Sequence, residues 1–455
     1  GYSTDYYRNI SNKVSKAKVL LFNLGADTVK GSKIRAILEE MGIKAVTVEK
    51  SQINQSVGYL AGYKGFAGDA EAFTGSGYTA EFMLMSGLSE TQLDQFLAKM
   101  RAADAVIDHK ATVTETTAPP DLYSDIDDMI SKMTVEEKVG QLFYVNCRGN
   151  DMSDAINKYH IGGVLLFGVD FDGKTKEEVN ADIKAMQSNA KIPLIIGTDE
   201  EGGTVVRASD NPNLRDSAYL SPSDTFDNGG WSAIEDDAYD KAEFLLSLGV
   251  NVNMAPVCDI TSDPYSFMYY RSFSSDAAST SRFVDTVVKA SKEKKLGTVL
   301  KHFPGYGDNG DTHYSSATDN RTFSDLQNND FLPFQAGIAA GADSILVSHV
   351  TVNSIDSGNP ASLSEPVHEV IRDKLKFDGV VMTDDLDMFA VDALDIYEPL
   401  SVVAFKAGND FLCCGDIENE YTALLNAVQS GEITADRIDE SVKRILIWKR
   451  NLAIL

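Results

Sequence analysis

The chain has few cysteines and lacks the patterns that make cysteine structural. It contains four, Cys147, Cys258, Cys413 and Cys414, in 455 residues, and no Cys-x-x-Cys pair. Cys413 and Cys414 are adjacent, so on a strand their side chains would point to opposite faces. We therefore expect buried, reduced thiols rather than a disulfide framework or a structural zinc site. Free thiols favour the cytoplasm; a secreted protein whose leader has been removed is the alternative.

Positive charge is also scarce. The sequence holds 41 Lys and Arg residues against 68 Asp and Glu residues, a formal net charge of −27. Nucleic acids and anionic membrane surfaces are bound through basic patches, so we expect neither as a partner. No apolar run is long enough to span a membrane, and the N-terminal residues lack the apolar core of a signal peptide.

The length suits two domains, and the pattern changes along the chain. Residues 1–117 predict a small α/β domain, with strands at Val19–Asn23 and Phe82–Met85. Apolar residues at helical spacing from Ile34 to Met41, and a Ser89–Gln92 capping box, predict two helices. Residues 54–80, rich in Gly, Ala and aromatics, predict a loop or hairpin, and residues 118–124 a linker.

Residues 125–455 predict a (β/α)₈ barrel of the TIM type. A Thr134–Glu137 capping box opens the domain, and apolar runs then alternate with helical stretches. The eight apolar runs are Gln141–Cys147, Gly162–Phe167, Leu194–Thr198, Val250–Val257, Thr298–His302, Ser344–His349, Gly379–Thr383 and Asp410–Cys414. The helical stretches include Lys176–Ala190, Ala238–Leu248, Ala277–Lys294, Leu326–Ala340, Val367–Lys376 and Tyr421–Ser430. Uninterrupted apolar strands joined by helices indicate a parallel sheet covered on both faces. A doubly wound open sheet is the alternative.

Titratable side chains follow most of these strands at their carboxyl ends. They are Asp199, Arg207, Asp259, Arg271, Lys301, His302, Asp311, His313, His349, Asp384 and Asp385. A single aspartate after a strand is usually a turn or cap residue. In a barrel, however, all of these side chains would meet at one rim, where such folds keep their active sites. The stretch from Lys301 to His313 alone carries two of the six histidines.

Glycoside hydrolysis fits this set of residues. It needs an ionised carboxylate on one side of the anomeric carbon and a proton donor on the other. Asp384 supplies the carboxylate, His313 supplies a group that titrates near neutral pH, and Asp311 could orient the imidazole. Asp199, Arg207, Arg271, Lys301 and His302 would then hold the sugar. No cofactor is needed.

Two other interpretations remain open. His302, His313, His349 and Asp384 could hold a zinc for metal-dependent hydrolysis. Such barrels usually carry a His-x-His pair at the end of the first strand, and Leu142–Cys147 has none. The barrel could also bind sugars without turnover.

From about residue 125 onward the sequence resembles glycoside hydrolase family 3, in particular its barrel-only β-N-acetylglucosaminidases. The matching stretches are Lys132–Leu142, Asp199–Arg207, Arg271–Phe273, Lys301–His313, Pro360–Ser364 and Asp378–Met388. The resemblance implies a retaining exo-enzyme that releases terminal GlcNAc. It implies that Asp384 is the nucleophile, His313 the acid/base and Asp311 its partner. It also implies that Asp199, Arg207, Arg271, Lys301 and His302 bind substrate. Carbohydrate metabolism and peptidoglycan turnover are the processes such an enzyme would serve.

The resemblance has consequences and departures. Members that cleave glucosides commonly take the acid/base from a glutamate in a C-terminal domain, whereas about 70 residues follow Asp384 here. We therefore expect the acid/base to come from the barrel. Tyr306 stands where many members have His, and the loop before Asp311 is a residue shorter than in many. The N-terminal unit resembles a small bacterial domain of unknown function, which implies no activity.

An imidazole base leads to one further expectation. A carboxylate base would repel an incoming anion, whereas a neutral imidazole would not, so phosphate could compete with water as the acceptor. A rival mechanism would use the substrate's own 2-acetamido oxygen as nucleophile, with Asp384 and Asp385 as orienting carboxylates.

Overall fold

The computed structural model describes residues 17–49, 52, 81–86, 88–107, 109–113, 124–392 and 397–455. The chain divides into two compact units, residues 1–124 and 125–455, which are described separately below. The predicted loop at 54–80 and nearly all of the predicted linker lie outside the described residues. No helix among these residues is long and apolar enough to cross a membrane.

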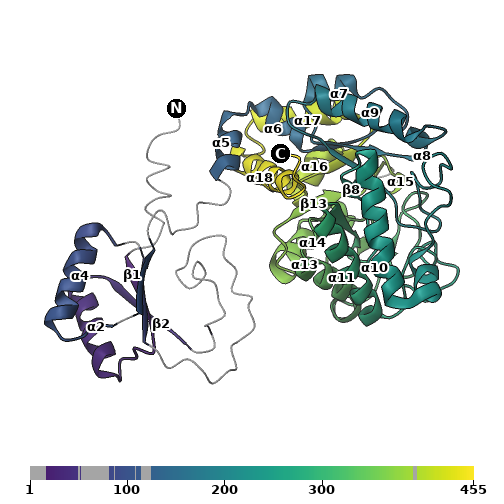
Figure 1. Ribbon diagram of the computed structural model, residues 1–455. Helices are drawn as coiled ribbons and strands as arrows, with labels where there is room; N and C mark the ends of the chain where they lie inside the picture. The colour runs from purple at the N-terminus through teal and green to yellow at the C-terminus, as the bar shows by residue number, and fades with distance from the viewer. Residues whose placement is uncertain are drawn as a thin grey trace. The chain divides into compact units, whose positions relative to one another are not determined.

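The first unit has helices packed on a four-stranded sheet. Its strands are β1 (Lys18–Phe22), β2 (Lys44–Val48), β3 (Phe82–Ser86) and β4 (His109–Val113), in the order β2-β1-β3-β4. Strand β1 is parallel to β2 and antiparallel to β3. Helices α2 (Val29–Glu40) and α4 (Glu90–Ala102) lie on one side of the sheet (Figure 1). Both predicted strands and both predicted helices are present, and the Ser89–Gln92 capping box opens α4.

The second unit is a barrel of eight parallel strands. They are β5 (Phe143–Asn146), β6 (Gly163–Leu166), β7 (Ile195–Thr198), β8 (Val252–Asn253), β9 (Gly297–Phe303), β11 (Ser344–Val347), β13 (Val380–Thr383) and β14 (Leu412–Cys414). Each neighbouring pair runs parallel, in the order β13-β11-β9-β8-β7-β6-β5-β14. A parallel bridge between Met382 and Phe411 joins the two outer members of that order. The (β/α)₈ prediction is confirmed, and the open sheet is excluded.

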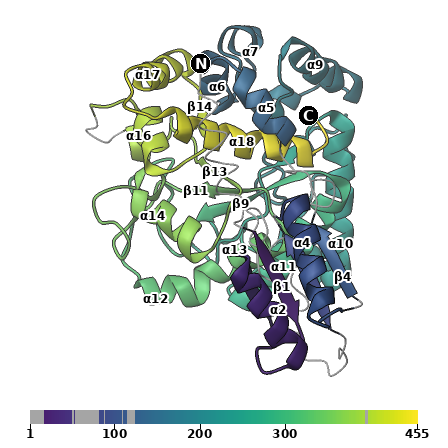
Figure 2. The ribbon, with the colours of Figure 1, turned by 90° about the vertical axis from the view of Figure 1, so that its left-hand side faces the viewer.

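Helices surround the strands of this unit (Figure 2). The α-helices are α5 (Ser124–Lys132), α6 (Val135–Gln141), α7 (Ser153–Tyr159), α8 (Gly168–Phe171), α9 (Lys176–Asn189), α10 (Pro222–Leu248), α11 (Ala277–Lys294), α12 (Phe323–Asp325), α13 (Phe331–Ala340), α14 (Glu365–Glu369), α15 (Phe389–Asp392), α16 (Leu400–Ala407), α17 (Ile417–Gln429) and α18 (Ala435–Asn451). Turns of other helix types are η2 (Leu326–Asp330) and η4 (Val370–Lys374), both π-helical, and the 3₁₀ turn η3 (Ala361–Leu363). Two short strands, β10 (Thr318–Asp319) and β12 (Thr351–Val352), pair outside the barrel.

Two predicted elements differ in length from those observed. Helix α10 begins at Pro222, sixteen residues before the predicted start at Ala238, and is kinked at Gly230, whose backbone (φ 65°, ψ −151°) is not helical. The adjacent glycines Gly229 and Gly230 hid its first half, because glycine disfavours helix. Strand β8 covers two residues of the predicted Val250–Val257. Pro256 has no N–H to donate to a neighbouring strand, so regular pairing stops before it.

A buried charge cluster holds the amino ends of the strands. Asp410, just before β14, accepts from Arg372 at 2.6 Å, from Arg444 at 3.1 Å and from the hydroxyl of Ser441 at 2.5 Å. Burial would raise the pKa of Asp410, but the surrounding arginines lower it to about 2. The cluster ties α18 and η4 to the sheet at the end of the barrel opposite the predicted active site. Charge pairing at this end of a barrel serves stability rather than chemistry.

Lys449 of α18 gives a test of this packing. It is fully buried, its ammonium donates to Gln141 Oε1 at 2.6 Å, and burial lowers its pKa to about 7. An unfolded lysine titrates near ~10.4, so the folded state resists protonation and loses stability as pH falls from ~10 toward 7. Below pH 7 the fold bears the full cost of the lowered pKa of Lys449.

We predict that Lys449→Met raises the free energy of unfolding by about 1–3 kcal/mol at pH 6.5. This value already allows for the lost hydrogen bond to Gln141. The gain should shrink as the pH is raised toward 9.5. Urea unfolding at several pH values measures it, with the exposed Lys132→Met as control. A gain independent of pH would contradict a shifted pKa at Lys449.

Candidate active site

Four charged side chains at the carboxyl ends of β7, β8 and β9 form one buried network. Lys301 Nζ lies 2.6 Å from Asp199 Oδ1 and 2.6 Å from Glu201 Oε1. Arg271 donates twice to Glu201, from Nε at 2.9 Å and from Nη2 at 2.7 Å. Two cations thus face two carboxylates, which offsets the cost of removing each charge from water.

The pKa values of these groups follow from the pairing. Burial would raise the pKa of Glu201, but Arg271 and Lys301 together hold it well below its usual range. Burial would lower the pKa of Lys301 and of Arg271, but the facing carboxylates raise both. The network therefore keeps its charges at any pH at which the protein would work.

His302 is held beside this network in one tautomer. Its Nδ1 lies 2.7 Å from Asp259 Oδ2, and its Nε2 lies 3.2 Å from Arg271 Nη2. A guanidinium only donates, so Nε2 accepts and Nδ1 carries the proton. Asp259 also accepts the backbone N–H of His302 at 3.0 Å and of Tyr306 at 2.7 Å. Asp259 therefore fixes both the imidazole and the start of the loop that follows.

Arg207 borders the network with unused hydrogen-bond donors. Its Nη2 lies 4.0 Å from Asp199 Oδ2, and its buried Nε has no partner among the described residues. Glu200 holds the turn that carries it, accepting the backbone N–H groups of Arg207 at 3.1 Å and of Ala208 at 2.8 Å. A guanidinium fixed in this way can donate to the oxygen of a ligand.

Asp384 follows β13, and several groups of the rim act on its carboxylate. Burial would raise its pKa, but His349, His302, His313 and the backbone N–H of Asp385 outweigh burial, and the net pKa is lower than usual. That N–H donates to Asp384 Oδ1 at 2.9 Å. Asp384 is therefore an ionised carboxylate, which is the state that a nucleophile needs.

His349 supports the Asp384–Asp385 turn rather than offering a free imidazole. Its Nε2 lies 2.9 Å from the carbonyl oxygen of Asp385, and its Nδ1 lies 2.6 Å from Ser362 Oγ. Burial lowers the pKa of His349, so the ring is neutral and Nε2 carries the proton. The Asp385 carboxylate accepts from Asn146 at 2.9 Å and from Arg148 at 2.6 Å, which ties it to the rim beyond β5.

His313 lies on the loop after β9 and keeps one ring nitrogen free. Its Nδ1 lies 2.7 Å from Asp311 Oδ1, which also accepts the backbone N–H of His313 at 2.9 Å. The side chain is 55% exposed. Asp311 therefore sets the proton on Nδ1 and leaves Nε2 for exchange with a ligand.

The loop of His313 is attached on both sides. Tyr306 Oη lies 2.5 Å from Thr312 Oγ1, and the carbonyl of Thr312 accepts the N–H of Ala390 at 3.2 Å. Ala390 belongs to α15, six residues after Asp384. The loop with the imidazole is thus bonded to the segment with the carboxylate, and each of the two groups lies within the electrostatic range of the other.

The structure brings the predicted site residues to one rim of the barrel. Asp199, Arg271, Lys301 and His302 share one network, Arg207 borders it, and Asp311 pairs with His313 near Asp384. Sequence reasoning placed Asp259 and His349 at the rim but gave Glu201 and Asp259 no role in the hydrolase site, and it considered His349 only as a zinc ligand. Glu201 and Asp259 do follow strands, and the need of a buried cation for a partner was the signal that could have found them.

Two of the four proposed zinc ligands, His302 and His349, are engaged elsewhere. Both ring nitrogens of His302 and both of His349 already have protein partners. Within the described part of the chain, no group of three or more His, Cys, Asp or Glu side chains is arranged to hold a metal ion. The residues offered for metal-dependent hydrolysis therefore do not fit a metal.

A parallel barrel with an ionised carboxylate and an exposed imidazole at one rim holds the nucleophile and the proton donor that a glycoside hydrolase needs. A model described as "Glycosyl hydrolase family 3 N terminal domain" matches residues 134–447. The chain belongs to glycosyl hydrolase family 3, as the sequence resemblance predicted.

Characterised relatives carry related names. "Beta-hexosaminidase LpqI" of Mycobacterium tuberculosis is 28% identical over 337 residues, covering 70% of this chain and 83% of that protein. A "Beta-hexosaminidase" of Stenotrophomonas maltophilia is 34% identical over 236 residues, covering 50% of this chain and 69% of its own length.

Solved structures agree with the fold. A glycoside hydrolase family 3 β-N-acetylglucosaminidase from Paenibacillus sp. has a TM-score of 0.67 and 30% identity, covering 71% of this chain and 63% of that one. A β-N-acetylhexosaminidase from Beutenbergia cavernae has a TM-score of 0.63 and 26% identity, covering 70% of this chain and 99% of that one.

Glu201 provides a test of the buried network. Its lowered pKa means that it stabilises the fold above about pH 4, and that this contribution is lost as pH falls toward the folded-state value. Glu201→Gln leaves Lys301 and Arg271 short of one negative charge, which should cost about 3–5 kcal/mol of unfolding free energy at pH 7.

The difference in unfolding free energy between Glu201→Gln and wild type should narrow as the pH is lowered below 4. Denaturant unfolding at pH 7, 5 and 3.5 measures it, and the exposed Glu136→Gln is the matched control. Equal unfolding free energies of Glu201→Gln and wild type at pH 7 would show that the fold does not need the Glu201 charge to offset Arg271 and Lys301.

Proposed function

We propose that this glycoside hydrolase is a retaining exo-β-N-acetylglucosaminidase, which removes terminal β-linked GlcNAc by double displacement. The observation that carries the proposal is that Asp384 and the Asp311–His313 dyad stand on two segments of one rim, which the hydrogen bond from Ala390 to Thr312 joins. The names of the relatives point to the same sugar.

In the first step His313 acts as the acid. Protonated at Nε2, it donates to the glycosidic oxygen while Asp384 attacks the anomeric carbon and the leaving group departs. Asp311 accepts from Nδ1 and stabilises the imidazolium before the proton is transferred. The product is a glycosyl ester on Asp384.

In the second step the neutral imidazole acts as the base. It takes a proton from water as the water oxygen attacks the anomeric carbon, and Asp384 leaves as a carboxylate. Two inversions at the same carbon give overall retention. The lowered pKa of Asp384 keeps it ionised for the first step and makes it a better leaving group in the second.

The buried network would fix the sugar for this reaction. Asp199 keeps part of its carboxylate exposed to accept from hydroxyl groups, and Arg207 has donors to spare. One side of the proposed sugar site consists of Lys301, Arg271 and His302, which ion pairs and hydrogen bonds hold in place. Such positioning is a large part of catalysis, because it replaces the ordering of reactants in solution.

The substrate-assisted rival receives less support. It needs a second carboxylate aimed at the 2-acetamido group, and the Asp385 carboxylate is bonded to Asn146 and Arg148 instead. A sugar-binding barrel without turnover would have no need for an ionised nucleophile beside an oriented imidazole.

We predict that Asp384→Asn lowers kcat on an aryl β-GlcNAc by about 10⁴-fold or more, since the covalent route is closed. His313→Ala should lose about 10²–10⁴-fold on poor leaving groups and far less on a dinitrophenyl leaving group, which departs without an acid. Added azide should restore turnover in His313→Ala as the β-glycosyl azide.

The matched control is Asp387→Asn, an exposed aspartate on the same turn, which should keep wild-type activity. If His313→Ala loses the same factor on both leaving groups and azide does not rescue it, His313 is not the acid/base. Substantial activity in Asp384→Asn would exclude Asp384 as nucleophile.

We further propose that inorganic phosphate competes with water as the acceptor. The base is a neutral imidazole, open to solvent, so an anion approaching the glycosyl ester does not meet a carboxylate base. Attack by a phosphate oxygen would yield GlcNAc-1-phosphate, with Asp384 as the leaving group and the imidazole as proton acceptor.

This prediction is checked by separating the products formed with and without 10 mM-scale phosphate at equal ionic strength. We expect the sugar phosphate to appear only with phosphate present and in the retained β configuration. GlcNAc as the single product in both cases rules out phosphorolysis.

A further inference from the structure

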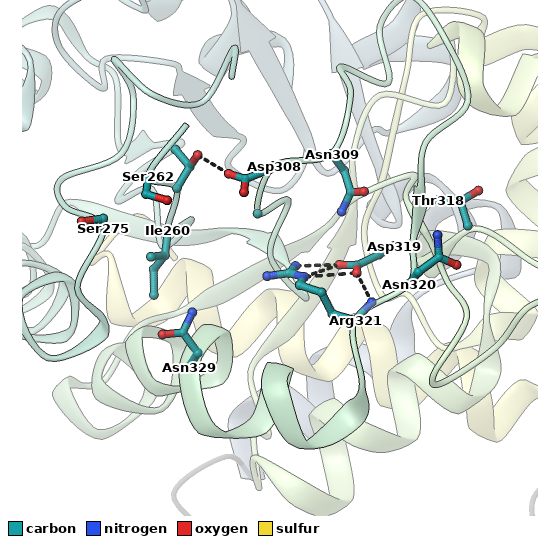
Figure 3. A pocket seen from close by; sticks show the side chains of 12 residues that line it. Ile260, Ser262, Ser275, Asp308, Asn309, Thr318, Asp319, Asn320, Arg321 and Asn329 are labelled. Carbon is teal, nitrogen blue, oxygen red and sulfur yellow. Dashed lines mark hydrogen bonds and ion pairs between the residues drawn. The ribbon is translucent and has the colours of Figure 1, made fainter. Parts of the chain in front are cut away.

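A cavity lies beside the loop that carries His313. Its volume is about 560 Å³, and none of the proposed catalytic or sugar-binding residues lines it. Figure 3 shows its lining side chains around an open space. They come from the segments after β8 and β9, from the residues at β10 and from η2, and include Ser262, Ser275, Asp308, Asn309, Asn320 and Asn329.

The lining offers many hydrogen-bonding groups among its apolar surface. Three asparagine amides face it together with serine and threonine hydroxyls, and Ile260 is the single large apolar side chain of the lining. The size falls within the ~300–1,000 Å³ of small-molecule sites, but the polarity exceeds that of most. A ligand that suits it is rich in hydroxyl groups.

The charge of the cavity argues for a neutral ligand. Its only cation, Arg321, is bonded to Asp319 at 2.6 Å, to Asp330 at 2.7 Å and to the carbonyl of Gly305 at 2.9 Å. The lining holds two carboxylates, Asp308 and Asp319, against this one guanidinium, a charge of 1 − 2 = −1. Phosphate or a sugar carboxylate would meet net repulsion here.

The cavity and the loop of His313 are packed as one unit. Gly307 lies in the left-handed region (φ 54°), and a Cβ there would lie 2.7 Å from the Arg321 guanidinium. Only glycine lets the loop pass so close. Asp308 accepts from Thr261 Oγ1 at 2.6 Å, which ties the loop to the segment after β8.

The same two segments expose tyrosines. Tyr265 is 95% exposed and follows Ile260–Ser262, and Tyr314 is 81% exposed and follows His313. Tyr269 and Tyr270 are also exposed. Exposed aromatic rings with a polar tip provide faces against which sugar rings can pack.

We infer that the cavity binds a neutral sugar residue on the leaving-group side of the scissile bond, so that the substrate is an uncharged oligosaccharide ending in β-GlcNAc. This rests on the proposed function: an acid must touch the glycosidic oxygen, so the leaving group lies against the loop of His313. The first half of that loop, Gly307–Asn309, is a wall of the cavity.

The test compares two neighbouring asparagines of η2. Asn329 lines the cavity, whereas Asn328 is exposed and bonds to Ser324. Asn329→Ala should lower kcat/KM for chitotetraose by about 3–10-fold, the value of a lost hydrogen bond, and leave kcat/KM for an aryl β-GlcNAc unchanged. Asn328→Ala should change neither. Ser275→Trp, which fills the cavity, should give a larger loss on chitotetraose alone.

Melting temperatures show whether each variant folds. Equal effects on both substrates, or no effect of Asn329→Ala and of Ser275→Trp on chitotetraose, would overturn the inference. Calorimetry on the inactive Asp384→Asn background tests the cavity independently of turnover: Ser275→Trp should weaken binding of chitotetraose but not of GlcNAc. If wild type cleaves no GlcNAc substrate, the proposed function fails and this binding comparison still decides whether the cavity holds a sugar.

A comparison of two disaccharides tests whether the cavity disfavours a charged sugar. A disaccharide whose second sugar is GlcNAc should be cleaved with higher kcat/KM than one whose second sugar is N-acetylmuramic acid, and Ser275→Trp should reduce that preference. A preference for the carboxylate-bearing sugar that Ser275→Trp abolishes would contradict a neutral leaving-group site.

Discussion

The buried pairing of Glu201 with Arg271 and Lys301 is the constraint on which the rest of the rim depends. Glu201 is almost without exposure, and its two oxygens link a residue from the segment after β8 to one on β9. From there the bonds continue to Asp199 and to His302, and through Asp259 to the backbone of Tyr306. The start of the His313 loop is therefore held by a chain of ion pairs and hydrogen bonds that begins two strands away, after β7.

This arrangement separates two electrostatic environments within one site. The network of Asp199, Glu201, Arg271 and Lys301 sets two carboxylates against two cations and is largely buried, so it keeps its geometry. The loop with His313 is exposed and bears a group that changes its protonation state during the proposed cycle. Rigid binding on one side and proton exchange on the other are the two demands of glycoside hydrolysis.

The sequence predicted the barrel because the signals were strong and consistent. All eight apolar runs became neighbouring strands, and the Thr134–Glu137 capping box opens α6 as expected. The errors have local causes. Gly229 and Gly230 masked the first half of α10, and Pro256 shortened β8. At the site, the residues proposed to meet the sugar were easier to predict than those that hold them in place. Asp259 and His349 act through other side chains, and which partner each one faces depends on tertiary distances that no spacing encodes.

The central claim is that Asp384 attacks the anomeric carbon directly. Incubation with a 2-deoxy-2-fluoro β-glycoside bearing a good leaving group slows the second step, so the glycosyl enzyme should accumulate. Mass spectrometry of the intact protein and of its peptides should find one fluorosugar, attached to Asp384. An enzyme that turns over β-GlcNAc but gives no adduct, or gives one on another residue, would contradict the account.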